Sequence, residues 1–299
     1  MRKFLILKGG LGNQLFQLSY FLYLKEIKGF KDLKVDLKTG FISDYKYKRK
    51  LEISDLSLYK LSCSRFISIL NLSLIFCKKY FPFLIKNIPV MIISDNDLLN
   101  IDYESINKSR KYILFYGYFQ DSFYVEKIIK KLMPIIKKNI NSKSKKIFND
   151  LYKDIKNFEN SIALCVRFYE ETKDPSKHAD SNFGIKKIEE YNKVIEELEK
   201  KIHLPYFFIF VQNENAFTRS LKINSPHRFI THDKGYVGSW ERLKAQAYCK
   251  HHIFNNSTFY YWGSQFSEFY YRDYKIELIR YVSNNFLFKE IYKDNWILF

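Results

Sequence analysis

Strands and helices alternate through the second half of the chain, and this order limits the fold more than any other feature of the sequence. Short apolar runs that end in polar residues predict strands, and the segments between them place apolar residues at helical spacing. The expected strands span 161–167, 206–214, 228–233 and 251–256, and the expected helices span 185–202, 239–250 and 257–266. Such alternation predicts a parallel sheet whose ligands bind at the carboxyl ends of the strands.

The first half begins with a unit of the same kind. The segment "KFLILKGGLGNQLFQLSYFLYLKE" predicts a strand, a glycine-rich turn and a helix, and residues 31–37 predict a second strand. A lysine-rich stretch, 127–160, suggests helices at a domain border, and 299 residues suffice for two domains of about 150 residues each. We therefore expect an α/β protein of two domains, residues 1–155 and residues 156–299.

The chain has a net charge of +18. This excess favours an anionic partner such as a phosphorylated substrate, anionic lipid or nucleic acid, or else reflects AT-rich codon usage and a solvated surface. The sequence has no RNP-type run and no recognition helix, so we expect no nucleic-acid partner. Residues 59–90 mix apolar runs with Lys78, Lys79 and Lys86, which predicts amphipathic helices that belong either to the core or to a membrane-surface contact.

The four cysteines form no CxxC pair, which argues against a zinc site or a disulfide framework and suits a reducing compartment. The apolar run 4–7 is too short for a signal peptide, and the run 66–76 is too short to span a bilayer. No carboxylate pair has metal-ligand spacing. We expect a cytoplasmic protein, soluble or peripheral on the inner membrane, that needs no metal or other cofactor.

Arg167 follows a buried strand of the second half. Its planar guanidinium can bind two oxygens of one anion, and a diphosphate fits that geometry. The alternative is a structural ion pair with Glu170 or Glu171.

A second anion site is expected where "NST" precedes an aromatic helix, at Asn256, Ser257 and Thr258. The hydroxyls and the free N–H groups of a helix N-terminus attract a phosphate by geometry and by the helix dipole. The alternative is that Ser257 only caps the helix.

The turn "GGLGNQ" spans residues 9–14 and is neither a Walker A loop nor a GxGxxG fingerprint. Its glycines let the backbone approach a ligand closely, and Asn13 and Gln14 would present amides there. The alternative is a plain strand-to-helix turn.

Together these segments resemble the bacterial α-1,2-fucosyltransferases of glycosyltransferase family 11. "GGLGNQLFQ" is similar to the N-terminal motif of the family, "FYGYFQDSFYV" (115–125) to its central segment, and "WERLKAQAYCKHHIFNNSTFYYWGSQF" (240–266) to its C-terminal run. The similarity covers most of the chain in order, and the last block is the most specific. The resemblance implies a GT-B-like fold, in which two Rossmann-like domains face each other across a cleft, and an inverting, metal-independent mechanism.

The resemblance also implies roles for single residues. The N-terminal domain becomes the acceptor side and the C-terminal domain binds the GDP-fucose donor. The implied catalytic residues are Arg167, Asn13 and Glu170, the last as the nearest candidate for a general base. The implied donor-binding set adds Glu241, Asn256, Ser257, Thr258 and Phe259 to Arg167, and the implied acceptor-side residues are Gly10, Gly12 and Gln14.

The chain departs from the family pattern around Arg167. Cys165 stands where the family has His, Phe168 where it has a second Arg, and Glu170 where it has Asp. A different nucleotide-sugar on the same scaffold, or a non-catalytic phosphate or glycan binder, therefore remains an alternative to fucosyl transfer. The expected reaction moves fucose to a hydroxyl of a glycan, with galactose O2 as the implied position. The expected setting is O-antigen or capsule synthesis on a lipid-diphosphate-linked acceptor, with peripheral contact to an anionic membrane.

Overall fold

The computed structural model describes residues 2–42, 44, 48–53, 60–140, 145–167, 187–286 and 289–299. The chain divides into two compact units, which we call the N-terminal unit (Met1–Asn139) and the C-terminal unit (Ile140–Phe299). The division lies earlier than the border expected at 155, because helix α8 (Lys146–Asn157) packs against helix α12 (Ser239–Tyr248) and so belongs to the C-terminal unit.

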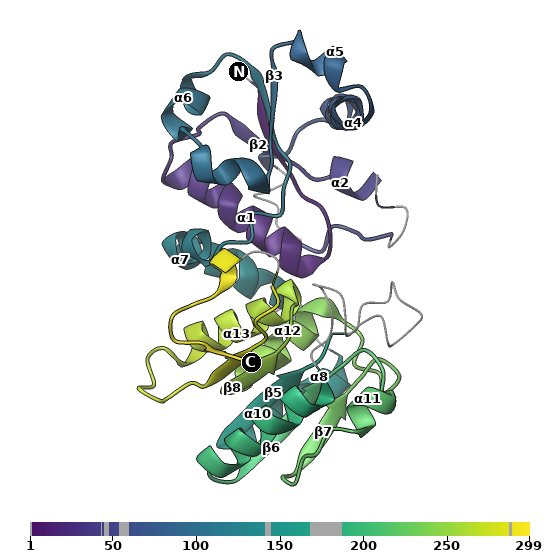
Figure 1. Cartoon of the computed structure of the whole chain (residues 1–299), viewed down its shortest axis with the longest axis vertical. Helices are drawn as coiled ribbons and strands as arrows, with labels where there is room; N and C mark the ends of the chain where they lie inside the picture. The colour runs from purple at the N-terminus through teal and green to yellow at the C-terminus, as the bar shows by residue number, and fades with distance from the viewer. Residues whose placement is uncertain are drawn as a thin grey trace. The chain divides into compact units, whose positions relative to one another are not determined.

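The N-terminal unit contains a four-stranded parallel sheet in the order β2-β1-β4-β3 (Figure 1). The strands are β1 (Lys3–Ile6), β2 (Leu33–Asp36), β3 (Val90–Ile93) and β4 (Tyr112–Phe115). The helices are α1 (Leu11–Glu26), α2 (Thr39–Ile42), α4 (Arg65–Tyr80), α5 (Pro82–Lys86), η1 (Asp95–Asn100), α6 (Tyr103–Lys108) and α7 (Ser122–Ile140).

Helices cover both faces of this sheet. Phe4 and Leu114 lie on the face against which α4 packs. Phe115, one residue further along β4, points to the opposite face and contacts Tyr20 of α1 with ring centroids 5.9 Å apart. Alternation of neighbouring side chains between two buried faces explains why β1 and β4 are continuous apolar runs.

The C-terminal unit contains a six-stranded parallel sheet in the order β10-β9-β8-β5-β6-β7. Numbered within the unit, the order read from the other edge is 3-2-1-4-5-6, which is the order of the dinucleotide-binding Rossmann fold. The strands are β5 (Asn160–Cys165), β6 (Pro205–Phe210), β7 (His227–Ile230), β8 (His251–Phe254), β9 (Arg280–Val282) and β10 (Ile297–Leu298). The further helices are α10 (Ile188–Lys201), α11 (Ala216–Arg219), α13 (Thr258–Tyr271) and η2 (Lys289–Ile291).

The predicted alternation of strand and helix is confirmed in this unit. Apolar side chains of α10 pack on one face of the sheet, together with Ile162, Leu164 and Ile209. Phe158, which follows α8, contacts Phe208 on the other face with ring centroids 6.1 Å apart. The chain is thus an α/β protein with two Rossmann-like units, as expected. The arrangement of the two units across a cleft stays a prediction.

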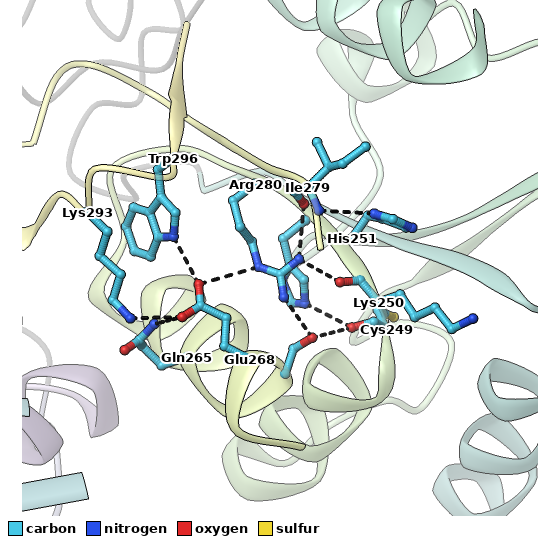
Figure 2. Close-up of polar contacts among 11 residues, drawn as sticks. Cys249, Lys250, His251, Gln265, Glu268, Ile279, Arg280, Lys293 and Trp296 are labelled. Carbon is cyan, nitrogen blue, oxygen red and sulfur yellow. Dashed lines mark hydrogen bonds and ion pairs between the residues drawn. The ribbon is translucent and has the colours of Figure 1, made fainter. Parts of the chain in front are cut away.

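A buried charge cluster ties α13 to the end of the chain (Figure 2). The Arg280 side chain is fully buried and donates to the carbonyls of Lys250 at 2.5 Å and Ile279 at 3.0 Å. Its Nε lies 3.8 Å from a carboxylate oxygen of Glu268, which also accepts hydrogen bonds from Lys293 at 2.8 Å and from the Trp296 indole at 3.0 Å. This cluster holds the C-terminal segment against α13.

The segment 59–90 forms the helices that its pattern predicts over the part that the structure describes, namely α4 and α5. Among the described residues, no helix is long and apolar enough to cross a membrane.

Candidate functional site

The carboxyl ends of β5 and β8 are neighbours where the strand order of the C-terminal unit reverses. Asn255 follows β8 and is fully buried. Its Oδ1 accepts a hydrogen bond from the Arg167 backbone N–H at 2.8 Å, and its Nδ2 donates to the Arg167 carbonyl at 2.9 Å. The two bonds fix the backbone of Arg167 and leave its side chain half-buried. Ligands of this fold bind at such a reversal point.

Helix α13 begins directly after this clamp. Ser257 is its N-cap residue, with φ −150° and ψ 117°, but the Ser257 side chain makes no capping hydrogen bond. The simple capping alternative is therefore not what the structure shows. Asn256, Ser257, Thr258 and Phe259 are all partly exposed. The N-terminus of this 14-residue helix offers backbone N–H groups and a positive dipole end beside the Arg167 backbone.

Two buried side chains form the floor beneath these residues. Arg242 donates to the carbonyls of Ile230 at 3.0 Å, Tyr236 at 3.2 Å and Val211 at 3.1 Å. The Tyr260 hydroxyl lies 3.2 Å from the carbonyls of Val166 and Phe210. Both side chains thus donate hydrogen bonds to carbonyl oxygens at the strand ends. Carbonyl oxygens that are bonded in this way repel an incoming anion less.

The floor also contributes charge. Burial lowers the pKa of the Arg242 guanidinium, and the nearby Arg167 charge lowers it further. Burial raises the pKa of Tyr260 to about 12, so the hydroxyl stays neutral at physiological pH. Because a low-dielectric surrounding weakens charge screening, the buried Arg242 charge strengthens the positive potential at the end of β5. The sequence pattern did not identify Asn255, Arg242 or Tyr260, although Asn255 directly precedes the predicted "NST" segment and Tyr260 lies two residues after it.

The structure places two further residues singled out from the sequence, Glu241 and Cys165, and does not describe a third, Glu170. Glu241 is partly exposed and lies against Gly238, where an added Cβ would stand 2.3 Å from a Glu241 carboxylate oxygen. Its role in donor binding stays a prediction. Cys165 is fully buried at the end of β5, and burial raises the pKa of its thiol. Glu170, together with Phe168, lies outside the described residues.

The glycine-rich turn of the N-terminal unit also lies at a reversal of strand order, between β1 and β4. Gly10 is the partly exposed N-cap of α1, and Gly12 is buried in its first turn. Gln14 is fully buried, and its amide bonds only backbone groups, donating to Gly9 and Lys50 at 2.9 Å and accepting from Glu52 at 2.9 Å. These contacts assign Gln14 to holding the turn and residues 50–52 in place, while an acceptor role for Gly10 stays a prediction.

Asn13 is the amide that this turn leaves accessible. It is partly exposed, and its Oδ1 accepts a hydrogen bond from Gln120 at 3.0 Å. The structure therefore brings together the turn 9–14 and the "GYFQ" segment, which are 107 residues apart at this bond. Lys8 lies beside them with its ammonium 3.8 Å from the centre of the Tyr116 ring and 4.5 Å from that of Tyr118.

Lys8, Asn13, Tyr116, Tyr118 and Gln120 form a second candidate edge, which combines amides, an ammonium group and aromatic rings. Burial lowers the pKa of the Lys8 ammonium, while Asp95 opposes the shift. Amides, an ammonium group and two aromatic rings can bind the hydroxyl groups and the apolar faces of a sugar. Of these residues, only Asn13 was predicted from the sequence, and Lys8, Tyr116, Tyr118 and Gln120 were not.

Replacement of Asn13 by Ala should lower turnover about tenfold or more, with GDP affinity changed less than about twofold. The reason is that Asn13 belongs to the N-terminal unit, whereas the expected diphosphate site belongs to the C-terminal unit. Initial rates at saturating donor and acceptor, together with GDP titrations, measure the two effects. Asn107→Ala is the matched control, since Asn107 is a partly exposed amide of the same unit that donates to the Gly29 carbonyl. An unchanged rate for Asn13→Ala would show that the turn is only structural.

The described residues contain no group of three or more His, Cys, Asp or Glu side chains that could hold a metal ion. Both candidate edges instead present amides, hydroxyls and cations.

No protein-family model matches the chain, and the curated proteins gave no significant match. A solved structure of a mutant of Arabidopsis thaliana FUT1 in complex with GDP is similar, with a TM-score of 0.48 and 12% sequence identity over 89% of this chain and 68% of that chain. A likeness of this size identifies no family, so the fold described above rests on the strand order and packing of each unit.

Proposed function

We propose that this protein is an inverting glycosyltransferase that uses GDP-fucose as donor and a glycan hydroxyl, galactose O2, as acceptor. The observation that carries the proposal is the clamp between Asn255 and Arg167 at the strand reversal of a 3-2-1-4-5-6 sheet. It places a guanidinium-bearing residue and an uncapped helix N-terminus at the edge where this fold binds nucleotides.

The proposed reaction is a single displacement at the anomeric carbon of the sugar. The acceptor oxygen forms the new bond from the face opposite the diphosphate, and the bond to the donor oxygen breaks with its electron pair going to the leaving GDP. The acceptor proton passes to a base, for which Glu170 is the candidate. Arg167 and the N–H groups at the start of α13 would stabilise the charge that develops on the phosphate, and one such donor supplies about 2.7–4 kcal/mol.

The glycan acceptor is proposed to bind the N-terminal unit at Asn13, Gln120 and the Tyr116 and Tyr118 rings. Their amide and aromatic groups support this assignment. The proposal includes a GT-B arrangement of the two units and a lipid-diphosphate-linked acceptor of the O-antigen or capsule type.

A second candidate is transfer of another sugar from a nucleotide donor. It is favoured by Cys165, which is fully buried at the position where the resembled family has His. A buried thiol with a raised pKa supplies no positive charge, which a His at this position could supply. Release of the nucleoside diphosphate from each of several nucleotide-sugars in turn, with GDP-fucose among them, separates the two candidates.

We expect GDP to raise the melting temperature of the C-terminal unit more than UDP, ADP or CDP do, without added metal. At a concentration of about 100 times Kd, a ligand specific for the folded state stabilises by about 2.7 kcal/mol, which corresponds to roughly 5–10 °C for a unit of this size. Tryptophan fluorescence follows this unit alone, because the three tryptophans of the chain, Trp240, Trp262 and Trp296, all belong to it.

Two variants test whether the shift comes from the proposed site. Arg167→Ala should lose most of the GDP-induced shift, whereas Arg219→Ala, at an exposed position on α11, should keep it. Equal shifts with all four nucleotides, or a strict need for Mn²⁺, would contradict the proposed donor.

A further inference from the structure

The helices α4 and α5 expose an unusual number of large apolar side chains on one surface. The stripe Phe66, Ile69, Phe76 and Tyr80 runs along α4 at intervals of three, seven and four residues, which places these side chains on one side of the helix. Their exposed fractions are 76%, 52%, 54% and 54%. The stripe continues through four further exposed residues, Phe81, Phe83, Leu84 and Ile88, and we call all eight the α4–α5 face.

The opposite side of α4 contains two buried polar residues. Ser68 and Asn71 are buried and donate to the fully buried Asp36 carboxylate, at 3.0 Å and 2.7 Å. The Tyr112 hydroxyl donates to Asn71 at 2.6 Å. α4 packs on the sheet through Ile67, Leu74 and Ile75, and the same side buries hydrogen-bonded polar groups. It also presents phenyl and alkyl groups outward, where an ordinary surface helix has charged and polar residues. Contiguous exposed apolar surface of this kind marks an interaction site.

The stretch of sequence that contains the α4–α5 face carries only positive charges. From residue 60 to residue 94 the sequence contains five basic residues and no Asp or Glu. Arg65, Lys78 and Lys79 are exposed on α4, and the Lys79 ammonium lies 4.9 Å from the centre of the Tyr80 ring. An apolar surface with exposed aromatic rings and basic residues matches the boundary between acyl chains and anionic headgroups in a lipid bilayer.

We propose that the α4–α5 face binds the surface of a bilayer that contains anionic phospholipid. A second copy of this chain is a poorer partner, because each copy would bring the same basic residues and a net charge of +18 to the contact. Aromatic and alkyl side chains would enter the headgroup region while Arg65 and Lys79 contact lipid phosphates. This proposal does not depend on the transferase reaction, and vesicle binding is measured without donor or acceptor.

Co-sedimentation of the full chain with vesicles tests the proposal. We expect binding to vesicles of phosphatidylcholine and phosphatidylglycerol, weak binding to phosphatidylcholine alone, and a loss of binding as the salt concentration rises. The double variant Arg65→Glu, Lys79→Glu should bind at least about 25-fold more weakly, since each basic residue near an anionic surface changes partitioning about fivefold.

The apolar part of the face is tested by Phe66→Ser, Phe83→Ser, which should also reduce partitioning about tenfold or more. Leu204→Ser is the matched control, because Leu204 is 78% exposed and belongs to the C-terminal unit. Melting curves establish that each variant is folded.

Three results would overturn the proposal. The first is failure of the wild-type chain to bind anionic vesicles, and the second is binding that neither double variant weakens. The third is a wild-type dimer that Phe66→Ser, Phe83→Ser converts to a monomer, which would make the face a contact between copies of the chain. A transferase that is active but does not bind vesicles would contradict this inference alone, and vesicle binding without turnover would contradict the proposed function alone.

Discussion

Arg167→Lys should lower turnover by two or more orders of magnitude, nearly as much as Arg167→Ala. A hundredfold loss corresponds to about 2.7 kcal/mol of transition-state stabilisation. Lys keeps one positive charge but presents it as a point donor on a flexible stem, whereas the Arg guanidinium can meet two phosphate oxygens together. Charge grows on those oxygens as the glycosidic bond breaks, so the Michaelis constant for the donor should change less than turnover.

The structure supplies a reason why Lys cannot adapt at this position. Both backbone polar groups of Arg167 bond to the Asn255 side chain, at 2.8 Å and 2.9 Å, so the starting point of the side chain is fixed. Arg167 is close enough to the buried Arg242 charge to be repelled by it, and a Lys side chain at this position would be repelled in the same way. Without a planar fork it gains fewer hydrogen bonds for the same electrostatic cost.

Rates normalised to folded protein, measured beside melting curves, check this prediction. Arg219→Lys is the control for the substitution itself, since Arg219 is exposed on α11. The competing account is an ion pair between Arg167 and Glu170 or Glu171. That account predicts variants that melt earlier while their folded fraction stays active. Near wild-type specific activity for Arg167→Lys would remove Arg167 from the proposed mechanism.

Much of the fold could be predicted because it depends on local pattern. Buried parallel strands are continuous apolar runs, so β1, β4, β5, β6 and β8 could be recognised from the sequence. The short strands β9 and β10 could not, because three and two residues give no periodic signal. The division of the two compact units at Asn139 has no local signal, because the contact between α8 and α12 joins segments about 90 residues apart.

The residues of the candidate site also differ in whether a local sequence pattern indicates them. Arg167 and the "NST" segment could be predicted because each has its own signature, a cation after an apolar strand and small polar residues before a helix. Asn255 could not, because its amide acts on a backbone 88 residues away. Arg242 could not, because its role depends on three carbonyls from different strands and turns. Sequence periodicity identifies helices and strands, whereas hydrogen bonds between residues that are distant in the sequence appear only in the three-dimensional structure.

Loss of the Glu268 carboxylate should destabilise the C-terminal unit by about 3–5 kcal/mol, which is the usual effect of leaving a buried charge without its partner. Glu268→Gln would leave the fully buried Arg280 guanidinium and the Lys293 ammonium beside a neutral amide. It would also weaken the contact that holds the Trp296 indole at 3.0 Å. Denaturant unfolding followed by tryptophan fluorescence reports on this unit alone.

Two further variants show that the effect belongs to the buried cluster. Glu277→Gln is the surface control, because Glu277 pairs with Lys201 at 3.1 Å with both side chains at least half exposed, and its loss should cost less than about 1 kcal/mol. The double variant Arg280→Met, Glu268→Gln should cost less than the sum of its single variants, since it removes both charges of one contact. Additive losses would show that Arg280 and Glu268 stabilise the unit independently.

The pH dependence gives an independent check with a definite sign. Burial acts to raise the pKa of the Glu268 carboxyl, but Arg280 and Lys293 outweigh it, so the pKa lies below its usual value. A carboxylate with a lowered pKa adds stability above its unfolded pKa of about 4.3, and this stability is lost as pH falls through the folded-state pKa. The gap in unfolding free energy between wild type and Glu268→Gln should therefore be largest near neutral pH and shrink in acid below about pH 4. A gap that stays constant from neutral pH into acid would mean that the Glu268 charge does not stabilise the cluster.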